Sequence, residues 1–160
     1  MSLIEKRLES LGLTASAWHD TGKLNPGSGN AQFKIYDDLL FVTALEPTGD
    51  DGKPAFVGRL GREYTKEEGY MAARLVGLNM LNIIRAALGT LDRVDYVIKC
   101  MALVNTADGF ADLPEVADGF TDVLTEALGE RGMHARTDFG ATNLNNNVPV
   151  MCDAIIKIRN

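Results

Sequence analysis

The chain has few of the residues that build metal sites and disulfide frameworks, since its 160 residues include two cysteines and two histidines. Cys100 and Cys152 lie in apolar runs far apart in the sequence, so we expect both to be small buried hydrophobic side chains. The histidines and cysteines have no recognised ligand spacing, and the acidic residues form no calcium-loop pattern. We therefore expect no metal, no cofactor and no disulfide.

Positive charge is also scarce, because 16 Lys and Arg residues face 22 Asp and Glu residues for a formal net charge of -6. Contacts of Lys and Arg with phosphates supply most nonspecific nucleic-acid affinity, so this charge argues against a nucleic-acid partner. The sequence lacks an uninterrupted apolar run of about 18 residues. Glu5 stands where a signal peptide would have its apolar stretch. We expect a soluble, cytoplasmic protein with no membrane partner.

With 160 residues and 46% hydrophobic content, the chain is long enough for one well-buried core. It is too short for two ordinary domains. We therefore predict a single domain over residues 1–160, in which residues 1–30 form an N-terminal helix and loop extension. Apolar residues at helical spacing indicate a short helix over residues 2–11 that ends at Gly12. The stretch 14–30 is rich in Gly, Ser and Pro and is predicted to be a loop.

Strand patterns occur in the first and the second half of the chain. Residues 33–36 and 39–42 are predicted to form a hairpin around Asp37-Asp38. Residues 94–104 and 148–158 are apolar on both alternating faces, which is typical of strands that are covered on each side.

Two longer helices have clear start signals. Thr65 and Glu68 have the spacing of a capping box, and the long helix that they begin should end at Gly89 in a left-handed cap. Asp112 is expected to cap a second helix, with Pro114 in its first turn where a missing amide costs nothing.

This order of elements predicts an α/β (α+β) fold with a single mixed sheet and two helices packed on one face. The strands nevertheless carry apolar residues on both faces. A monomer would expose the uncovered face as a large apolar patch, so the sequence requires a partner.

Arg136 lies within a strand-like run near the C-terminal end. A guanidinium stays charged at any physiological pH and cannot be left buried and unpaired, so an anion must hold it. That anion could be the carboxylate of a ligand, or that of Asp118, Asp122 or Asp153 in an ion pair. Asp138 should face the same side of the strand, either as the salt-bridge partner or as a polar pocket wall.

Four segments resemble the YjgF/RidA family of small trimeric proteins, and the last two resemble a subgroup described as chorismate-mutase-like: Leu39-Leu40-Phe41-Val42, Glu67-Glu68-Gly69, Val116-Ala117-Asp118-Gly119 and His134-Ala135-Arg136. The resemblance covers nearly the whole chain. It implies a homotrimer whose sheets pack into a central barrel, with ligand clefts between subunits.

The same resemblance implies that Arg136 binds the carboxylate of a small organic acid, and that Thr43 and Ala44 replace a Ser-Gly pair beside it. Threonine can supply the hydroxyl, whereas alanine removes a glycine that lets backbone approach the ligand. The glutamate proposed to position the hydrolytic water aligns with Met151, which can neither accept a proton nor orient water. Asp153 should face the same side of its strand as Met151 and could substitute.

Other polar residues have both a functional and a structural interpretation. A pocket tyrosine of the family aligns with Asn30. His19 and His134 could be acid-base groups near neutral pH, but we expect both to be hydrogen-bonded or solvated. Asparagines 145–147 could donate amide contacts to a ligand, but we expect them to form a turn.

We therefore expect a RidA-like trimeric protein that binds small carboxylate metabolites, 2-imino or 2-keto acids, in intersubunit clefts. The predicted ligand-binding residues are Arg136, Thr43, Ala44, Asp138 and Met151. One hypothesis is an enamine/imine deaminase, a hydrolase of the 2-iminobutanoate/2-iminopropanoate type. The alternative is a non-catalytic metabolite-binding or regulatory module. An endoribonuclease is disfavoured by the acidic charge and by the lack of a convincing paired acid and base.

Overall fold

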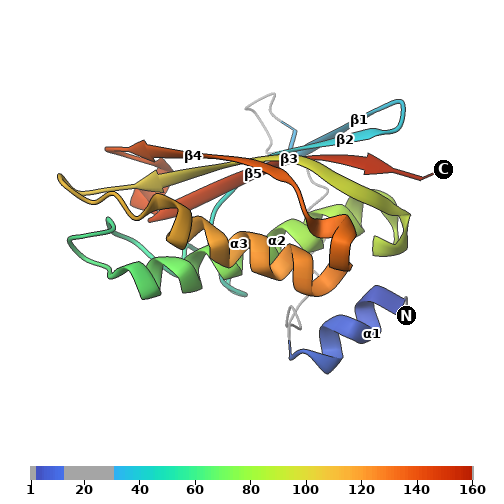
Figure 1. Cartoon of the computed structure of the whole chain (residues 1–160), viewed down its shortest axis with the longest axis horizontal. Coiled ribbons are helices and arrows are strands. Elements are labelled where there is room, and N and C mark those ends of the chain that lie inside the picture. Colours follow the sequence, from blue (N-terminus) through green and yellow to red (C-terminus); the bar gives the residue numbers. More distant parts are fainter. Residues whose placement is uncertain (1–2, 13–30, 160) are drawn as a thin grey trace.

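A five-stranded sheet in the order β1-β2-β5-β3-β4 forms one layer of the molecule, and helices cover one of its faces (Figure 1). The structure is a computed structural model and describes residues 3–12 and 31–159. The predicted loop 14–30, with His19 and Asn30, lies outside the described residues. The strands are β1 Phe33–Tyr36, β2 Leu39–Leu45, β3 Val94–Asn105, β4 Ala135–Ala141 and β5 Val150–Ile158. The helices are α1 Leu3–Ser10, α2 Lys66–Leu88 and α3 Leu113–Leu128.

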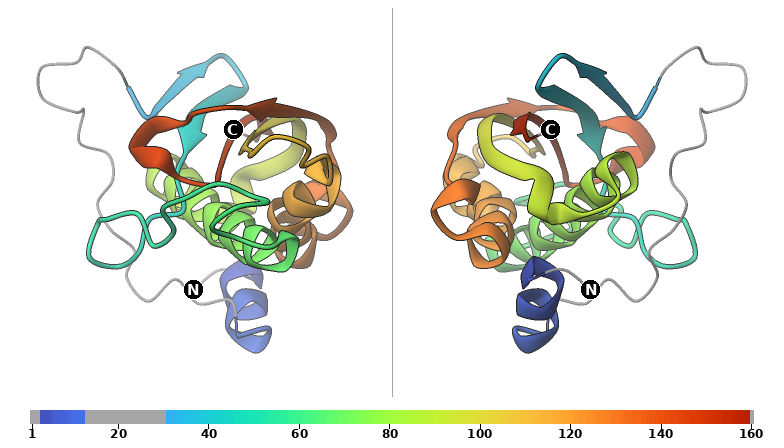
Figure 2. Two further views of the ribbon diagram at one scale, coloured as in Figure 1. Left: turned by 90° about the vertical axis from the view of Figure 1, so that its left-hand side faces the viewer. Right: turned by 90° about the vertical axis from the view of Figure 1, so that its right-hand side faces the viewer.

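The sheet is mixed, as predicted. Strands β3 and β4 pair in parallel across the α3 crossover, whereas β1-β2, β2-β5 and β5-β3 pair antiparallel. The end views in Figure 2 show the sheet arching over α2 and α3, with α1 on the far side of these two helices. The predicted arrangement of both long helices on one face is therefore confirmed.

Local signals placed most helix ends correctly. Thr65 and Glu68 form both hydrogen bonds of the capping box, and Gly89 ends α2 with a φ of 79°. Asp112 occupies the N-cap position of α3, as predicted, but its side chain makes no capping hydrogen bond. Pro114 occupies the second helical position and has no N–H to donate. The Asp112 carboxylate lies instead 3.4 Å from the amine of Lys66.

The core lies between the sheet and the long helices. Alternate strand residues, such as Cys100 and Ala102 of β3, are buried against apolar residues of α2 and α3. The two helices approach so closely that a Cβ on Gly119 of α3 would lie 2.1 Å from the Tyr70 carbonyl oxygen of α2. Helix α2 is long and apolar enough to cross a membrane by composition, but 56% of its most apolar window is buried, as in a core helix of a globular fold.

Cys100 and Cys152 are both buried and unbonded, as expected. Burial raises the pKa of both thiols. They therefore act as small core residues.

The opposite sheet face carries no helix among the described residues (Figure 2). We call it the open face, and the pairing register places on it Phe41, Thr43, Met101, Leu103, Thr137, Phe139, Met151, Asp153 and Ile155. Several of its apolar side chains are exposed in a single chain, including Phe41 (39%), Met101 (36%) and Phe139 (57%). The apolar sheet face that the sequence predicts to be uncovered in a monomer is therefore present as the open face.

Candidate ligand site

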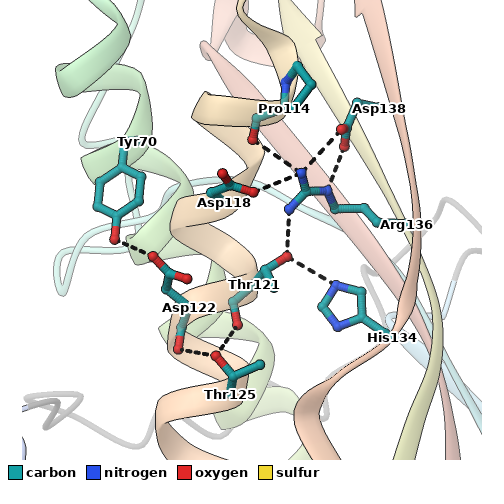
Figure 3. Close-up of polar contacts among 9 residues, drawn as sticks. All are labelled: Tyr70, Pro114, Asp118, Thr121, Asp122, Thr125, His134, Arg136 and Asp138. Atoms are coloured by element: carbon teal, nitrogen blue, oxygen red, sulfur yellow. Dashed lines mark hydrogen bonds and ion pairs between the residues drawn. The ribbon is translucent and has the colours of Figure 1, made fainter.

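The five predicted ligand-binding residues fall into two groups on one chain. Arg136 and Asp138 lie on the edge strand β4 and point toward α3 (Figure 3). Thr43, Ala44 and Met151 line a hollow on the other side of the sheet and at a different strand end. A single chain therefore does not bring the arginine to the other three residues.

Arg136 is held by five hydrogen bonds. Its Nε donates to Asp138 Oδ1 at 2.7 Å and its Nη2 to Asp138 Oδ2 at 3.2 Å, a paired contact in which two N–H groups meet one carboxylate. Nη2 also donates to Asp118 Oδ1 at 3.0 Å and to the Pro114 carbonyl at 3.1 Å, and Nη1 donates to Thr121 Oγ1 at 2.6 Å. Figure 3 shows how these contacts join β4 to α3.

Among the open alternatives for Arg136, the structure contains the ion pair with Asp118, and Asp138 is its salt-bridge partner. The Arg136 and Asp138 side chains are 14% and 17% exposed, whereas Asp118 is 54% exposed. Burial alone would lower the pKa of Arg136, but the hydrogen bonds that its guanidinium donates to Asp138 and Asp118 outweigh burial, so that the pKa is raised. The binding of a ligand carboxylate by Arg136 stays a prediction.

His134 belongs to the same network and is fully hydrogen-bonded, as expected. Its Nδ1 lies 2.7 Å from the Gly132 carbonyl and its Nε2 lies 3.2 Å from Thr121 Oγ1. The Thr121 hydroxyl accepts from Arg136, so its own O–H can donate to an unprotonated Nε2. Burial, with a contribution from the Arg136 charge, lowers the pKa of His134. The imidazole is thus a neutral bridge between Gly132 and Thr121.

The second group surrounds a hollow of 660 Å³, which we call the Met151 hollow. Thr43 and Ala44 lie where β2 loses its register with β5, between the pairs Val42–Ala154 and Leu45–Cys152. Such a bulge bends a strand and redirects its side chains, and bulges are frequent beside functional sites. The remaining lining residues are Leu103, Met151 and the tract Asn143–Asn147. None of these lining residues carries a charge.

Met151 is buried, and its sulfur-bearing side chain occupies the place where the family resemblance expects a glutamate. Asp153 faces the same side of β5, as predicted from alternation, but it does not line the hollow. Its Oδ1 accepts from the Met101 backbone N–H at 2.8 Å. Burial raises the pKa of Asp153, although this backbone hydrogen bond opposes the shift.

Sequence reasoning missed the connection between the asparagine tract and Glu46. Asn146 and Asn147 adopt left-handed φ values of 53°, which agrees with the turn that we expected. Asn146 Nδ2 also lies 3.1 and 2.9 Å from the two carboxylate oxygens of Glu46. No local signal marks this contact, because the two residues are 100 positions apart.

Residues 3–12 and 31–159 contain no group of three or more His, Cys, Asp or Glu side chains that could hold a metal ion.

Comparison with known proteins places this geometry in a family. Residues 30–156 match the family described as "YjgF/chorismate_mutase-like, putative endoribonuclease". Protein TCP17 of Trypanosoma cruzi is 36% identical over 122 residues, which cover 76% of each chain. The chain therefore belongs to the YjgF/chorismate mutase-like family.

Two solved structures have the same fold over almost the whole chain. The protein Atu1372 of Agrobacterium tumefaciens, of unknown function, aligns with a TM-score of 0.86 and 32% identity over 98% of this chain and 92% of its own. A protein of Shewanella oneidensis described as a putative endoribonuclease also has a TM-score of 0.86, with 26% identity over 98% of this chain and 100% of its own. The family resemblance read from the sequence is confirmed.

Proposed function

We propose that this protein binds small carboxylate metabolites, 2-imino or 2-keto acids, in clefts between the subunits of a homotrimer in the cytoplasm. The observation that supports this most directly is that the predicted ligand-binding residues form two separate groups on one chain. The described residues that line the Met151 hollow offer a hydroxyl and amides but no cation, while the guanidinium of Arg136 lies elsewhere on the same chain. An assembly of chains is the arrangement that could bring the two together.

The exposed apolar side chains of the open face favour association between chains. Burying exposed apolar side chains such as Phe41, Met101 and Phe139 stabilises association by roughly 25 cal/mol for each Å² removed from water. The Met151 hollow borders this face through Leu103 and Met151, so that a neighbouring subunit on the face would also close the hollow.

The contacts of Arg136 suggest how a ligand could enter. Asp138 is 17% exposed and paired through two bonds, whereas Asp118 makes one bond and is mostly exposed. An exposed ion pair contributes little, about 0–1 kcal/mol. A ligand carboxylate would therefore displace Asp118 from Nη2 while Asp138 continues to orient the guanidinium.

The lining of the Met151 hollow argues against fast hydrolysis. General base catalysis requires an ionisable group within hydrogen-bond reach of the attacking water. Methionine cannot serve, and Asp153 is engaged with the Met101 amide outside the hollow. We accordingly propose binding with little imine hydrolysis, which is the behaviour of a metabolite-binding or regulatory module. Hydrolysis of RNA, which the family description mentions, is disfavoured by the net charge of -6.

Titration calorimetry with pyruvate and 2-oxobutyrate tests the proposal. Arg136→Lys should weaken binding about tenfold, because lysine keeps the charge but loses the planar fork. Asp118→Asn should strengthen binding, because it removes the competing carboxylate. Asp112→Asn is the matched control, since it removes the same charge from the same end of α3 without contact to Arg136. Binding that Arg136→Lys leaves unchanged would overturn the site.

Two further measurements complete the test. Sedimentation should find a trimer at micromolar concentration, and a monomer would remove the intersubunit cleft. A coupled assay of imine breakdown should show slow turnover by the wild type and faster turnover by Met151→Glu. Rapid wild-type turnover would show that Met151 does not mark a loss of hydrolysis.

A further inference from the structure

A second hollow, of 420 Å³, lies between α2 and the end of β2, and we call it the α2 hollow. It shares Thr43 and Ala44 with the Met151 hollow but is otherwise formed by different residues, among them Asn79, Asn82 and Ile83 of α2. Its volume falls in the range of small-molecule sites, about 300–1,000 Å³. The volume alone does not identify a ligand, but the lining residues indicate the chemistry of one.

Two amide side chains that line the α2 hollow are incompletely satisfied. Asn82 is 9% exposed, and its Oδ1 is buried without a hydrogen-bond partner among the described residues. Gln32 Oε1 is in the same condition. Both atoms are acceptors, and leaving a buried acceptor unpaired is unfavourable. A molecule that completes these contacts must therefore offer N–H or O–H donors.

The charge of the lining residues further restricts the chemical class of the ligand. Among the described residues that line the α2 hollow, Glu46 is the one charged residue, and neither Lys nor Arg is present. The Glu46 carboxylate is oriented by Asn146 and keeps acceptor capacity, since a carboxylate offers about four lone-pair sites. The hollow therefore disfavours anions and favours a cation.

The walls are held in place and are partly apolar. Asn79 donates its amide to the carbonyls of Glu46 at 3.0 Å and Thr48 at 3.1 Å, which ties the loop after β2 to α2. Leu45 and Ile83 supply aliphatic surface for the body of a ligand.

We propose that the α2 hollow binds a small organic cation, an amine or amidine with an apolar body. The cationic head donates to Asn82 Oδ1 and Gln32 Oε1 and faces Glu46, while the body lies on Leu45 and Ile83. This site has the opposite charge preference from the proposed acid site, and it shares Thr43 and Ala44 with the Met151 hollow. It would let the protein respond to an amine beside the strand end that carries Thr43 and Ala44.

Nuclear magnetic resonance titration of the full-length protein with butylamine tests this proposal, and butyrate is the counter-probe of equal chain length. Butylamine should produce saturable shifts of the side-chain amides of Gln32 and Asn82, and butyrate should not. Glu46→Gln should weaken butylamine binding roughly tenfold or more, because a charge-assisted contact is lost. Asn82→Leu should abolish it, because leucine keeps the size and removes the acceptor.

Asn82→Asp keeps the test decisive if Asn82→Leu does not fold. Aspartate only accepts hydrogen bonds and adds a negative charge, so butylamine should bind this variant more tightly than the wild type. Ser10→Asp adds the same charge at an exposed position of α1 that lines neither hollow, and it should leave butylamine affinity unchanged. Equal shifts with butyrate, no saturable shift with butylamine, or unchanged binding in both Glu46→Gln and Asn82→Asp would each overturn the proposal.

Discussion

Replacing Arg136 by leucine should measure how far this guanidinium is a structural clamp between β4 and α3. The substitution removes all five hydrogen bonds of the side chain and leaves the Asp138 carboxylate, which is 17% exposed, without its two partners. Breaking a buried ion pair from one side costs about 3–5 kcal/mol, because a desolvated charge remains. Since a small part of this pair still reaches water, we expect a loss near the lower limit, about 3 kcal/mol.

Two further variants show how much of this loss in the free energy of unfolding comes from the contact with Asp118 and how much from the contact with Asp138. Asp118→Asn should cost less than about 1 kcal/mol, because more than half of the Asp118 side chain is exposed and water screens the pair. The double variant Arg136→Leu/Asp138→Leu should recover more than half of the loss, since an apolar pair leaves no buried charge.

Urea denaturation followed by far-ultraviolet circular dichroism would measure these changes in the free energy of unfolding. Protein concentration must be the same for every variant, because subunit association adds to the apparent stability. A loss below about 1 kcal/mol for Arg136→Leu would refute the clamp. An equal loss for Asp118→Asn would show that the exposed pair, rather than Asp138, holds the guanidinium.

Two further predictions concern the core and the histidine bridge. Gly119→Ala should destabilise the fold by about 3 kcal/mol or more, because the new Cβ would lie 2.1 Å from the Tyr70 carbonyl oxygen and force α2 and α3 apart; a thermal melt with an unchanged midpoint would contradict this. The pKa of His134 is lowered in the folded state, so the unfolded chain binds this proton more readily, and stability should fall as the pH drops below about 6.5. His134→Asn should flatten this part of the stability–pH curve, and an unchanged curve would show that other groups cause the loss.

Local sequence signals were sufficient to predict many of the helices and strands. The capping box at Thr65 and the glycine at Gly89 define both ends of α2 because each acts on backbone groups within a few residues. Runs that are apolar on both faces located β3 and β5, because strands covered on each side carry apolar residues at successive positions. Family-like segments identified the fold. At the start of α3 the N-cap position of Asp112 was predicted correctly, but the Asp112 side chain does not make a capping hydrogen bond beside Pro114.

Tertiary structure alone decided how the site residues are grouped. Alternation placed Asp138 beside Arg136, but Thr121 and Asp118 reach the guanidinium from another element, 15 and 18 positions away. Packing of α3 on the sheet brings them there.

The same holds for the hollows. Glu46 meets Asn146 across 100 positions, and the α2 hollow arises where a bulged strand end passes over a helix. Such contacts depend on the relative placement of distant segments, which burial of the whole core determines and no local pattern records.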